Sequence, residues 1–133
     1  MTPLLDTHVL VWWQAGGERL SSDARRAIEG ADRLLVSPLT CWEVATLARL
    51  GRLVLDRPAT IWVQDLLQDP RIVAAPLGPD AAAWAGALGS DFPGDPIDRL
   101  LYATARDLRV PLITKDERLR EYVGHRGDVQ VVW

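Results

Sequence analysis

Short apolar runs alternate along the chain with longer segments in which apolar residues recur at helical spacing. Five of the runs have the length of a buried strand, at residues 3–6, 33–36, 71–77, 110–116 and 129–133. The segments with helical spacing lie at residues 7–17, 20–31, 38–50, 58–69, 79–88, 97–109 and 117–124. Regular alternation of strands and helices is typical of α/β folds, so the pattern predicts a largely parallel sheet flanked by helices.

Residues that favour helix ends mark several of these boundaries. The first helical segment stops at Gly16 and Gly17, and Gly51 follows the third. Ser21 or Ser22 is expected to cap the second helix. Pro38 has the first-turn position that proline favours. The local signals therefore agree with the periodicity.

Composition limits the class of protein. With 133 residues, 48% of them hydrophobic and 25% charged, the chain has the size and balance of one globular domain, and we assign residues 1–133 to a single domain. Cys41 is the only cysteine, which excludes a disulfide framework and a paired-cysteine metal site. No apolar run reaches the length of a membrane span, and no signal peptide is visible. We therefore expect a cytoplasmic protein with no membrane association.

The charge does not decide whether nucleic acid is a partner. The net charge is −3, unlike that of proteins that grip long stretches of nucleic acid by charge alone. The basic residues, however, are 14 arginines and one lysine, Lys115, and arginine suits bidentate phosphate contacts. An arginine-rich genome explains the same bias, so both interpretations stay open.

Acidic residues fall where a parallel sheet would gather them. Asp6 ends the first strand, and Asp116 ends the fourth. Glu43 lies in the helix after the second strand, while Asp95 and Asp98 begin the helix before the fourth. Because sites in parallel sheets form beyond the carboxyl ends of the strands, these carboxylates are expected to share one cleft. Clustered like charges favour a hard divalent cation such as Mg²⁺ or Mn²⁺, whose bound water hydrolyses phosphodiesters.

Four blocks of the sequence resemble a known family. They are "LLDTHVLVWW", "SPLTCWEVATLARLGRL", "DPIDRLLYATA" and "PLITKD", and their acids are 37, 55 and 18 residues apart. In this order and spacing they resemble the PIN domain, and most closely the VapC toxins of bacterial toxin–antitoxin pairs. The terminal "VQVVW" is also similar to the end of that subgroup. The resemblance covers nearly the whole chain.

The resemblance implies a three-layer PIN-like fold with a central, mainly parallel five-stranded sheet. It also implies a ribonuclease that depends on Mg²⁺ or Mn²⁺, with Asp6, Glu43, Asp98 and Asp116 as the catalytic, metal-binding acids. Asp95 is a frequent companion of this quartet. The expected partners are an RNA substrate, a VapB-like antitoxin whose tail covers the cleft, and a second copy of the chain.

Three further residues are candidates for supporting roles. Thr114 matches the small hydroxyl residue that often precedes the last acid of the family, and Thr7 is suited to place a hydroxyl near the site. Arg99 is expected to orient a carboxylate, to hold an RNA phosphate or to form a structural ion pair. One departure concerns the two positions before the third block, where the subgroup has a histidine and a basic residue and this chain has Pro93 and Gly94.

Structural roles explain some of the candidates equally well. Asp95 and Asp116 are suited to cap the helices that follow them, and Asp98 suits the positive end of a helix dipole. His8 is expected to be structural, because no second imidazole lies at metal-binding spacing. Among the six tryptophans we expect Trp42 in the core and Trp12 or Trp13 at a protein interface.

Two other functions compete with a ribonuclease. A phosphatase that forms an aspartyl-phosphate on Asp6 would normally have a second acid two residues later, where this chain has His8. A non-catalytic interaction module on the same fold would be expected to lack some of the acids, whereas this sequence has all of them. The sequence therefore favours the metal-dependent ribonuclease.

Overall fold

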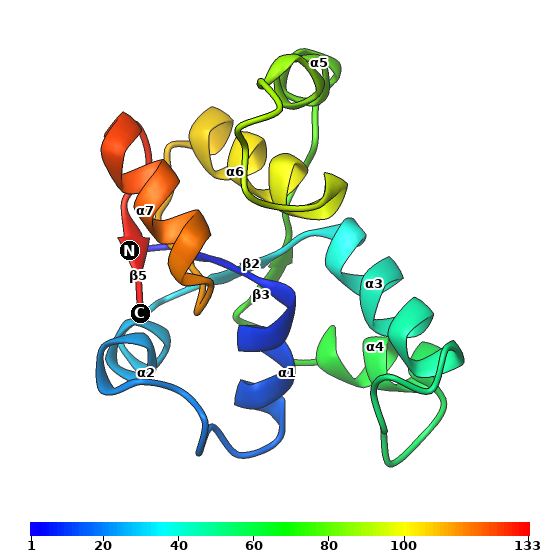
Figure 1. Cartoon of the computed structure of the whole chain (residues 1–133). Helices are drawn as coiled ribbons and strands as arrows, with labels where there is room; N and C mark the ends of the chain where they lie inside the picture. The colour runs from blue at the N-terminus through cyan, green and yellow to red at the C-terminus, as the bar shows by residue number, and fades with distance from the viewer.

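A parallel five-stranded sheet forms the centre of the computed structural model, which describes all 133 residues (Figure 1). The strands are β1 (Leu4–Leu5), β2 (Leu34–Val36), β3 (Ile72–Ala74), β4 (Leu112–Ile113) and β5 (Val131–Val132). Their order is β3-β2-β1-β4-β5, and all four neighbouring pairs are parallel. The predicted α/β fold is confirmed, and the sheet is wholly parallel where the sequence predicted a mainly parallel one.

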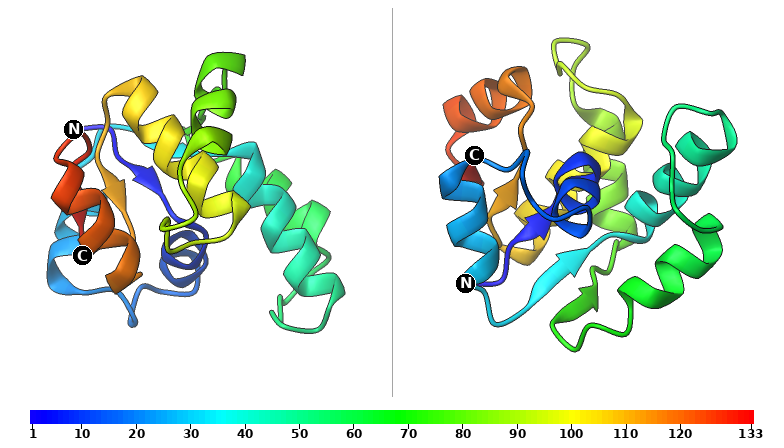
Figure 2. Two further views of the ribbon diagram at one scale, coloured as in Figure 1. Left: turned by 45° about the horizontal axis from the view of Figure 1, so that its top comes forward. Right: turned by 90° about the horizontal axis from the view of Figure 1, so that it is seen from below.

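Seven helices surround the sheet. They are α1 (Thr7–Gln14), α2 (Ser22–Glu29), α3 (Pro38–Arg49), α4 (Ala59–Leu66), α5 (Pro79–Ala87), α6 (Pro96–Leu108) and α7 (Glu117–Arg126). Helices α1 to α4 contribute to the core on one face of the sheet, and α6 and α7 to the core on the other (Figures 1 and 2). Helix α5 packs against α6. No helix has the length and apolarity to cross a bilayer.

Alternation along the strands divides the core between the two faces. Leu5 and Ile113 pack with α1 to α4, whereas their neighbours Leu4 and Leu112 pack with α6 and α7. All four side chains are fully buried. Successive strand residues point to opposite faces, so a strand of two residues is enough to join both halves of the core. The three-layer arrangement follows from strands that are apolar on both faces.

The structure corrects some details of the sequence analysis. The first helix ends at Gln14 rather than residue 17, because Gly16 and Gly17 have positive φ angles of 107° and 78°. Ser21 is the cap of α2, and its hydroxyl accepts from the Ala24 amide at 3.1 Å. The expectation that Trp42 is a core residue is wrong, since it is 60% exposed.

Helical geometry explains the exposure of Trp42. Thr40 and Val44, four residues apart, are fully buried and form the inner face of α3. Each residue of a helix turns by about 100°, so the position midway between them points in the opposite direction. Apolar character alone therefore did not decide which tryptophan enters the core.

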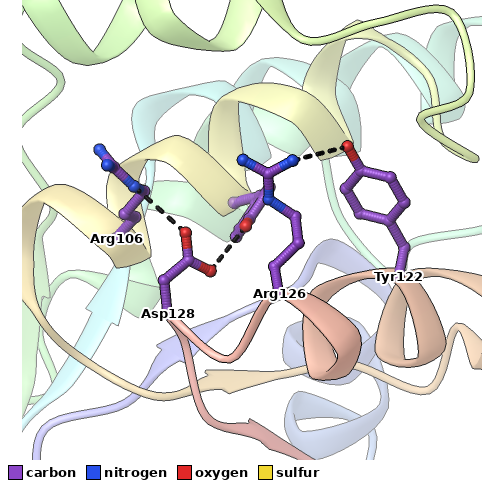
Figure 3. A network of polar contacts seen from close by, with 5 residues as sticks. Arg106, Tyr122, Arg126 and Asp128 are labelled. Atoms are coloured by element: carbon purple, nitrogen blue, oxygen red, sulfur yellow. Dashed lines mark hydrogen bonds and ion pairs between the residues drawn. The ribbon is translucent and has the colours of Figure 1, made fainter.

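A polar network joins α6, α7 and the segment before β5 (Figure 3). The buried Tyr102 hydroxyl donates to Asp128 at 2.6 Å, and Arg106 pairs with the same carboxylate at 3.2 Å. Arg126 donates to the Tyr122 hydroxyl at 3.3 Å. Burial, followed by the charge and hydrogen bond of Asp128, raises the pKa of Tyr102, so that the phenol remains a donor. The network holds the segment before β5 against the core that α6 and α7 form on their face of the sheet.

Removal of the Tyr102 hydroxyl should therefore destabilise the fold. We expect Tyr102→Phe to lower the free energy of unfolding by about 1–2 kcal/mol, because it breaks a hydrogen bond to a charged acceptor. Urea denaturation followed by circular dichroism measures the change. Arg118→Gln, at an exposed position of α7 outside this network, is the control and should lie within about 0.5 kcal/mol of wild type. Equal stability of Tyr102→Phe and wild type would contradict this role.

Candidate active site

The carboxyl ends of the strands open into a cleft lined entirely by polar residues, which we call the acidic cleft. Its volume is about 390 Å³. The lining residues are Asp6, His8, Glu43, Asp95, Asp98, Lys115, Asp116 and Glu117. The structure thus brings together all five acids that the sequence singled out. They come from the ends of β1 and β4 and from the N-terminal halves of α3, α6 and α7.

Asp6 is the most enclosed of these acids, with 7% of its surface exposed. Its Oδ1 accepts from the Thr7 amide at 2.7 Å, and its Oδ2 accepts from the Thr114 hydroxyl at 2.7 Å. Burial raises the pKa of Asp6, and the two hydrogen bonds oppose that rise. The side chain is therefore held rigidly while its negative charge stays costly.

The two threonines have the supporting positions that the sequence suggested. The Thr114 hydroxyl also accepts from the Asp116 amide at 3.1 Å, so one side chain ties the end of β1 to the start of α7. The Thr7 hydroxyl lies 3.4 Å from that of Thr40 and also lowers the pKa of Glu43. Both residues are buried.

Asp95 and Asp98 form a reciprocal cap at the start of α6. Asp95 Oδ1 accepts from the Asp98 amide at 2.9 Å, and Asp98 Oδ2 accepts from the Asp95 amide at 3.1 Å. Burial, followed by the nearby charges of Asp6 and Asp95, raises the pKa of Asp98 to about 7. The capping role of Asp95 is thus real, and it places Asp98 in the cleft.

The position before Asp95 has no space for a side chain. A Cβ atom on Gly94 would come within 2.6 Å of Asp98 Cβ and Oδ2 and within 2.9 Å of the Phe92 ring. A basic side chain at position 94, where the VapC subgroup that the sequence resembles has one, would therefore displace Asp98. Gly94, one of the two positions at which the sequence differs from that subgroup, thus allows the loop to pack closely against Asp98.

Glu43 and Asp116 complete the cleft from opposite sides of the sheet. Burial raises the pKa of the half-buried Glu43, and the charges of Asp95 and Asp6 add to that rise. Asp116 caps α7, and its Oδ1 accepts from the Leu119 amide at 3.1 Å. The predicted cap at Asp116 is confirmed, with the residue still exposed to the cleft.

Arg99 lies outside the cleft and pairs with no carboxylate. Its guanidinium donates to the carbonyls of Ala85, Leu88 and Gly89 at 3.2, 2.7 and 2.9 Å, and it lies over the Phe92 ring at 5.1 Å. It therefore caps the C-terminus of α5 and anchors the loop that leads to Asp95. Direct contact with a carboxylate or an ion pair is absent.

Three lining residues were missed by the sequence analysis. His8, expected to be structural, is exposed in the cleft beside Trp12, with ring centroids 6.1 Å apart. Lys115 and Glu117 flank Asp116 and line the same cleft. For Lys115 and Glu117, the sequence signal was their position next to Asp116 at a strand end. A turn that exposes one residue to the cleft also exposes its neighbours.

The donor chemistry of the cleft fits a hard divalent cation. Carboxylate oxygens are the ligands that Mg²⁺ and Mn²⁺ prefer. Burial and then the charges of Asp6 and Asp95 raise the pKa of Asp98, and a cation would favour its charged form against both. No three His, Cys, Asp or Glu side chains are already gathered around one ion position. A bound ion would therefore draw much of its coordination shell from water, as Mg²⁺ commonly does.

Comparison with known proteins assigns the family. The PIN domain matches residues 4–124 of the chain. The chain belongs to the PIN-domain family. This PIN domain is 48% identical over 121 residues to Ribonuclease VapC22 of Mycobacterium tuberculosis, a match that covers 91% of the chain and 92% of that protein.

Solved structures of toxin–antitoxin proteins have the same fold as this PIN domain. VapBC2 from Rickettsia felis, bound to a promoter DNA fragment, matches with a TM-score of 0.65 and 11% identity, covering 98% of this chain and 97% of that one. A toxin–antitoxin complex from Klebsiella pneumoniae matches with a TM-score of 0.60 and 23% identity, covering 86% and 87%. At these identities the likeness establishes the fold.

The raised pKa of Asp98 makes the stability of the metal-free PIN domain depend on pH. Its ordinary value is 3.8, so the folded state binds more protons than the unfolded chain between pH 3.8 and about 7. Stability should therefore fall as pH rises through this window and then level off. Asp98→Asn should reduce the slope, as measured by urea denaturation in chelator at several pH values.

The exposed Asp107→Asn variant is the control, since Asp107 lies outside the cleft on α6. It should keep the wild-type slope. A wild-type protein whose stability rises between pH 4.5 and 7 under these conditions would contradict the raised pKa.

Proposed function

We propose that this PIN domain is a metal-dependent endoribonuclease of the VapC type, in which Mg²⁺ or Mn²⁺ is the cofactor. The single observation that carries the proposal is the convergence of Asp6, Glu43, Asp98 and Asp116 on one cleft at the carboxyl edge of the sheet. The 48% identity to a protein named as a ribonuclease supports RNA as the substrate.

The acids have different roles in this proposal. Asp6, Asp98, Asp116 and Glu43 would hold the cation, and Asp95 would contribute while capping α6. A bound divalent cation supplies an acidified water and neutralises charge on the phosphate. Thr114 fixes the direction of the Asp6 carboxylate through its 2.7 Å hydrogen bond. Arg99 supports the site indirectly, through the loop that it anchors.

Neither competing function is favoured by the geometry. For an aspartyl-phosphate mechanism, the position two residues after Asp6 should offer an acid, but the side chain that lines the cleft there is His8. For a non-catalytic module, a complete set of like charges would be an electrostatic cost without a purpose. In a metal-dependent ribonuclease, the same clustered carboxylates bind the cation, which offsets their repulsion.

We also propose a protein partner, in the form of a VapB-like antitoxin, and a homodimer in the cytoplasm. Large apolar side chains are exposed mainly between residues 42 and 67, on α3, α4 and the loop between them. They are Trp42, Leu50, Val54, Ile61 and Leu67. Figure 1 shows α3 and α4 at one end of the molecule. Such clustering favours a protein interface.

Asp6→Asn tests the catalytic assignment. The substitution keeps the shape and one acceptor but removes the charge, so RNA cleavage in Mg²⁺ should fall by at least about a hundredfold. The fold should survive, because loss of the charge removes the cost of burying it. Cleavage of a structured RNA pool and circular dichroism measure the two effects. Asp107→Asn is the matched control and should cleave normally; wild-type cleavage by Asp6→Asn would refute the assignment.

Metal binding should be visible without any activity assay. Because a cation binds the folded cleft and not the unfolded chain, millimolar Mg²⁺ or Mn²⁺ should raise the melting temperature by at least about 2 °C. In the double variant Asp6→Asn, Asp98→Asn the shift should vanish, since two of the oxygen ligands lose their charge. Scanning calorimetry makes the comparison. Unchanged melting of wild type in both metals would count against a cation site.

A further inference from the structure

Two cationic side chains meet on one aromatic ring at the edge of the acidic cleft. Lys115 Nζ lies 4.7 Å from the centroid of Trp12, and Arg19 Cζ lies 5.7 Å from the same centroid. Lys115 also lines the cleft itself. Trp12 also contacts Trp133, with ring centroids 6.0 Å apart. We call Arg19, Lys115 and Trp12 the cationic rim.

Neither of these two cations forms an ion pair with an acid. The ion pairs of the structure are made by Arg26, Arg57, Arg71 and Arg106, and none involves Arg19 or Lys115. Both side chains are exposed. The indole holds them by cation–π attraction, which restrains their positions but leaves their N–H donors free. The rim therefore has two oriented cations and capacity for an anion.

The position of the rim points to a phosphate backbone. Six carboxylates line the acidic cleft. An RNA strand that brings a phosphate into the cleft is therefore repelled by their negative potential. A cation at the border offsets that field for the neighbouring phosphates. Lysine and arginine are the usual phosphate contacts of nucleic-acid-binding proteins.

We propose that Arg19 and Lys115 bind the RNA backbone beside the phosphate that is cleaved, with Trp12 as the positioning residue for both. The inference rests on the proposed ribonuclease function, since it assigns the path of that substrate. It makes the only lysine of the chain a substrate contact.

A second cluster of arginine and aromatic residues provides matched controls. Arg106 and Arg126 lie over the Trp84 ring, with Cζ at 4.3 and 5.7 Å from its centroid. Figure 3 shows these two arginines, which lie near the C-terminal ends of α6 and α7. Asp98 and Asp116 mark the opposite ends of these helices, at the cleft. Arg106 is already paired with Asp128. This cluster has the same chemistry as the rim but lies away from the site.

The test measures RNA binding separately from cleavage. Variants are made in the Asp6→Asn background, and a fluorescein-labelled single-stranded RNA of about 12 nucleotides is titrated by anisotropy over a range of KCl concentrations. Lys115→Gln and Arg19→Gln should each weaken binding at least about threefold at low salt. Each should also flatten the plot of log affinity against log salt by about 0.7, the value for one lost phosphate contact to a single strand.

Trp12→Leu tests the positioning role. It should weaken binding in the Asp6→Asn background but have no further effect when Arg19 and Lys115 are both glutamine, because it acts only through them. Lys115→Arg should restore the salt slope. Arg126→Gln and Trp84→Leu, the controls from the second cluster, should leave affinity and slope unchanged. Circular dichroism verifies that each variant is folded.

The outcomes separate this inference from the proposed function. If Lys115→Gln and Arg19→Gln keep the parental salt slope, the rim is not a phosphate site, even when the wild type cleaves RNA. If the slopes flatten but the wild type with Mg²⁺ leaves RNA intact, the rim stands and the ribonuclease proposal fails. A change of molar mass by light scattering in Trp12→Leu, with unaltered RNA affinity, would assign the surface to a contact between copies instead.

Discussion

The Asp6 carboxylate is the constraint on which the rest of the site depends. It ends the central strand, and its two oxygens accept from the first amide of α1 and from the Thr114 hydroxyl at the end of β4. The same hydroxyl accepts from the Asp116 amide at the start of α7. One buried charge thus sets the mutual positions of two strands and two helices. A neutral residue could not accept at both oxygens with the same strength.

This arrangement concentrates negative charge that the fold alone does not need. Burial and like charges raise the pKa values of Asp6, Glu43 and Asp98, so each carboxylate is destabilised by the presence of the others. The capping box of α6 and the absence of a side chain at Gly94 hold Asp98 in that position. In the proposed function a cation and the substrate relieve this repulsion. Such a cost in stability is common at active sites.

Aromatic rings organise the arginine-rich surface around this negative centre. Trp12 holds Arg19 and Lys115 near the cleft, and Trp84 holds Arg106 and Arg126 at a distance from it. Cation–π contacts restrain a charge without neutralising it, unlike ion pairs. Arg19 and Lys115 lie next to the cleft, whereas Arg106 and Arg126 lie near the far ends of α6 and α7.

The order of elements and the clustered acids were determined by the sequence itself. Short runs that are apolar at every position predict strands that are buried on both faces, as in a parallel sheet. Because all the strands point the same way, acids at the strand ends meet at the carboxyl edge of the sheet. Only the tertiary structure decided the surroundings of Arg99 and Lys115. Their environments consist of residues distant in the chain, such as the α5 carbonyls around Arg99 and the ring of Trp12 beside Lys115. Long side chains reach partners that no local pattern encodes, whereas backbone direction and periodicity are local.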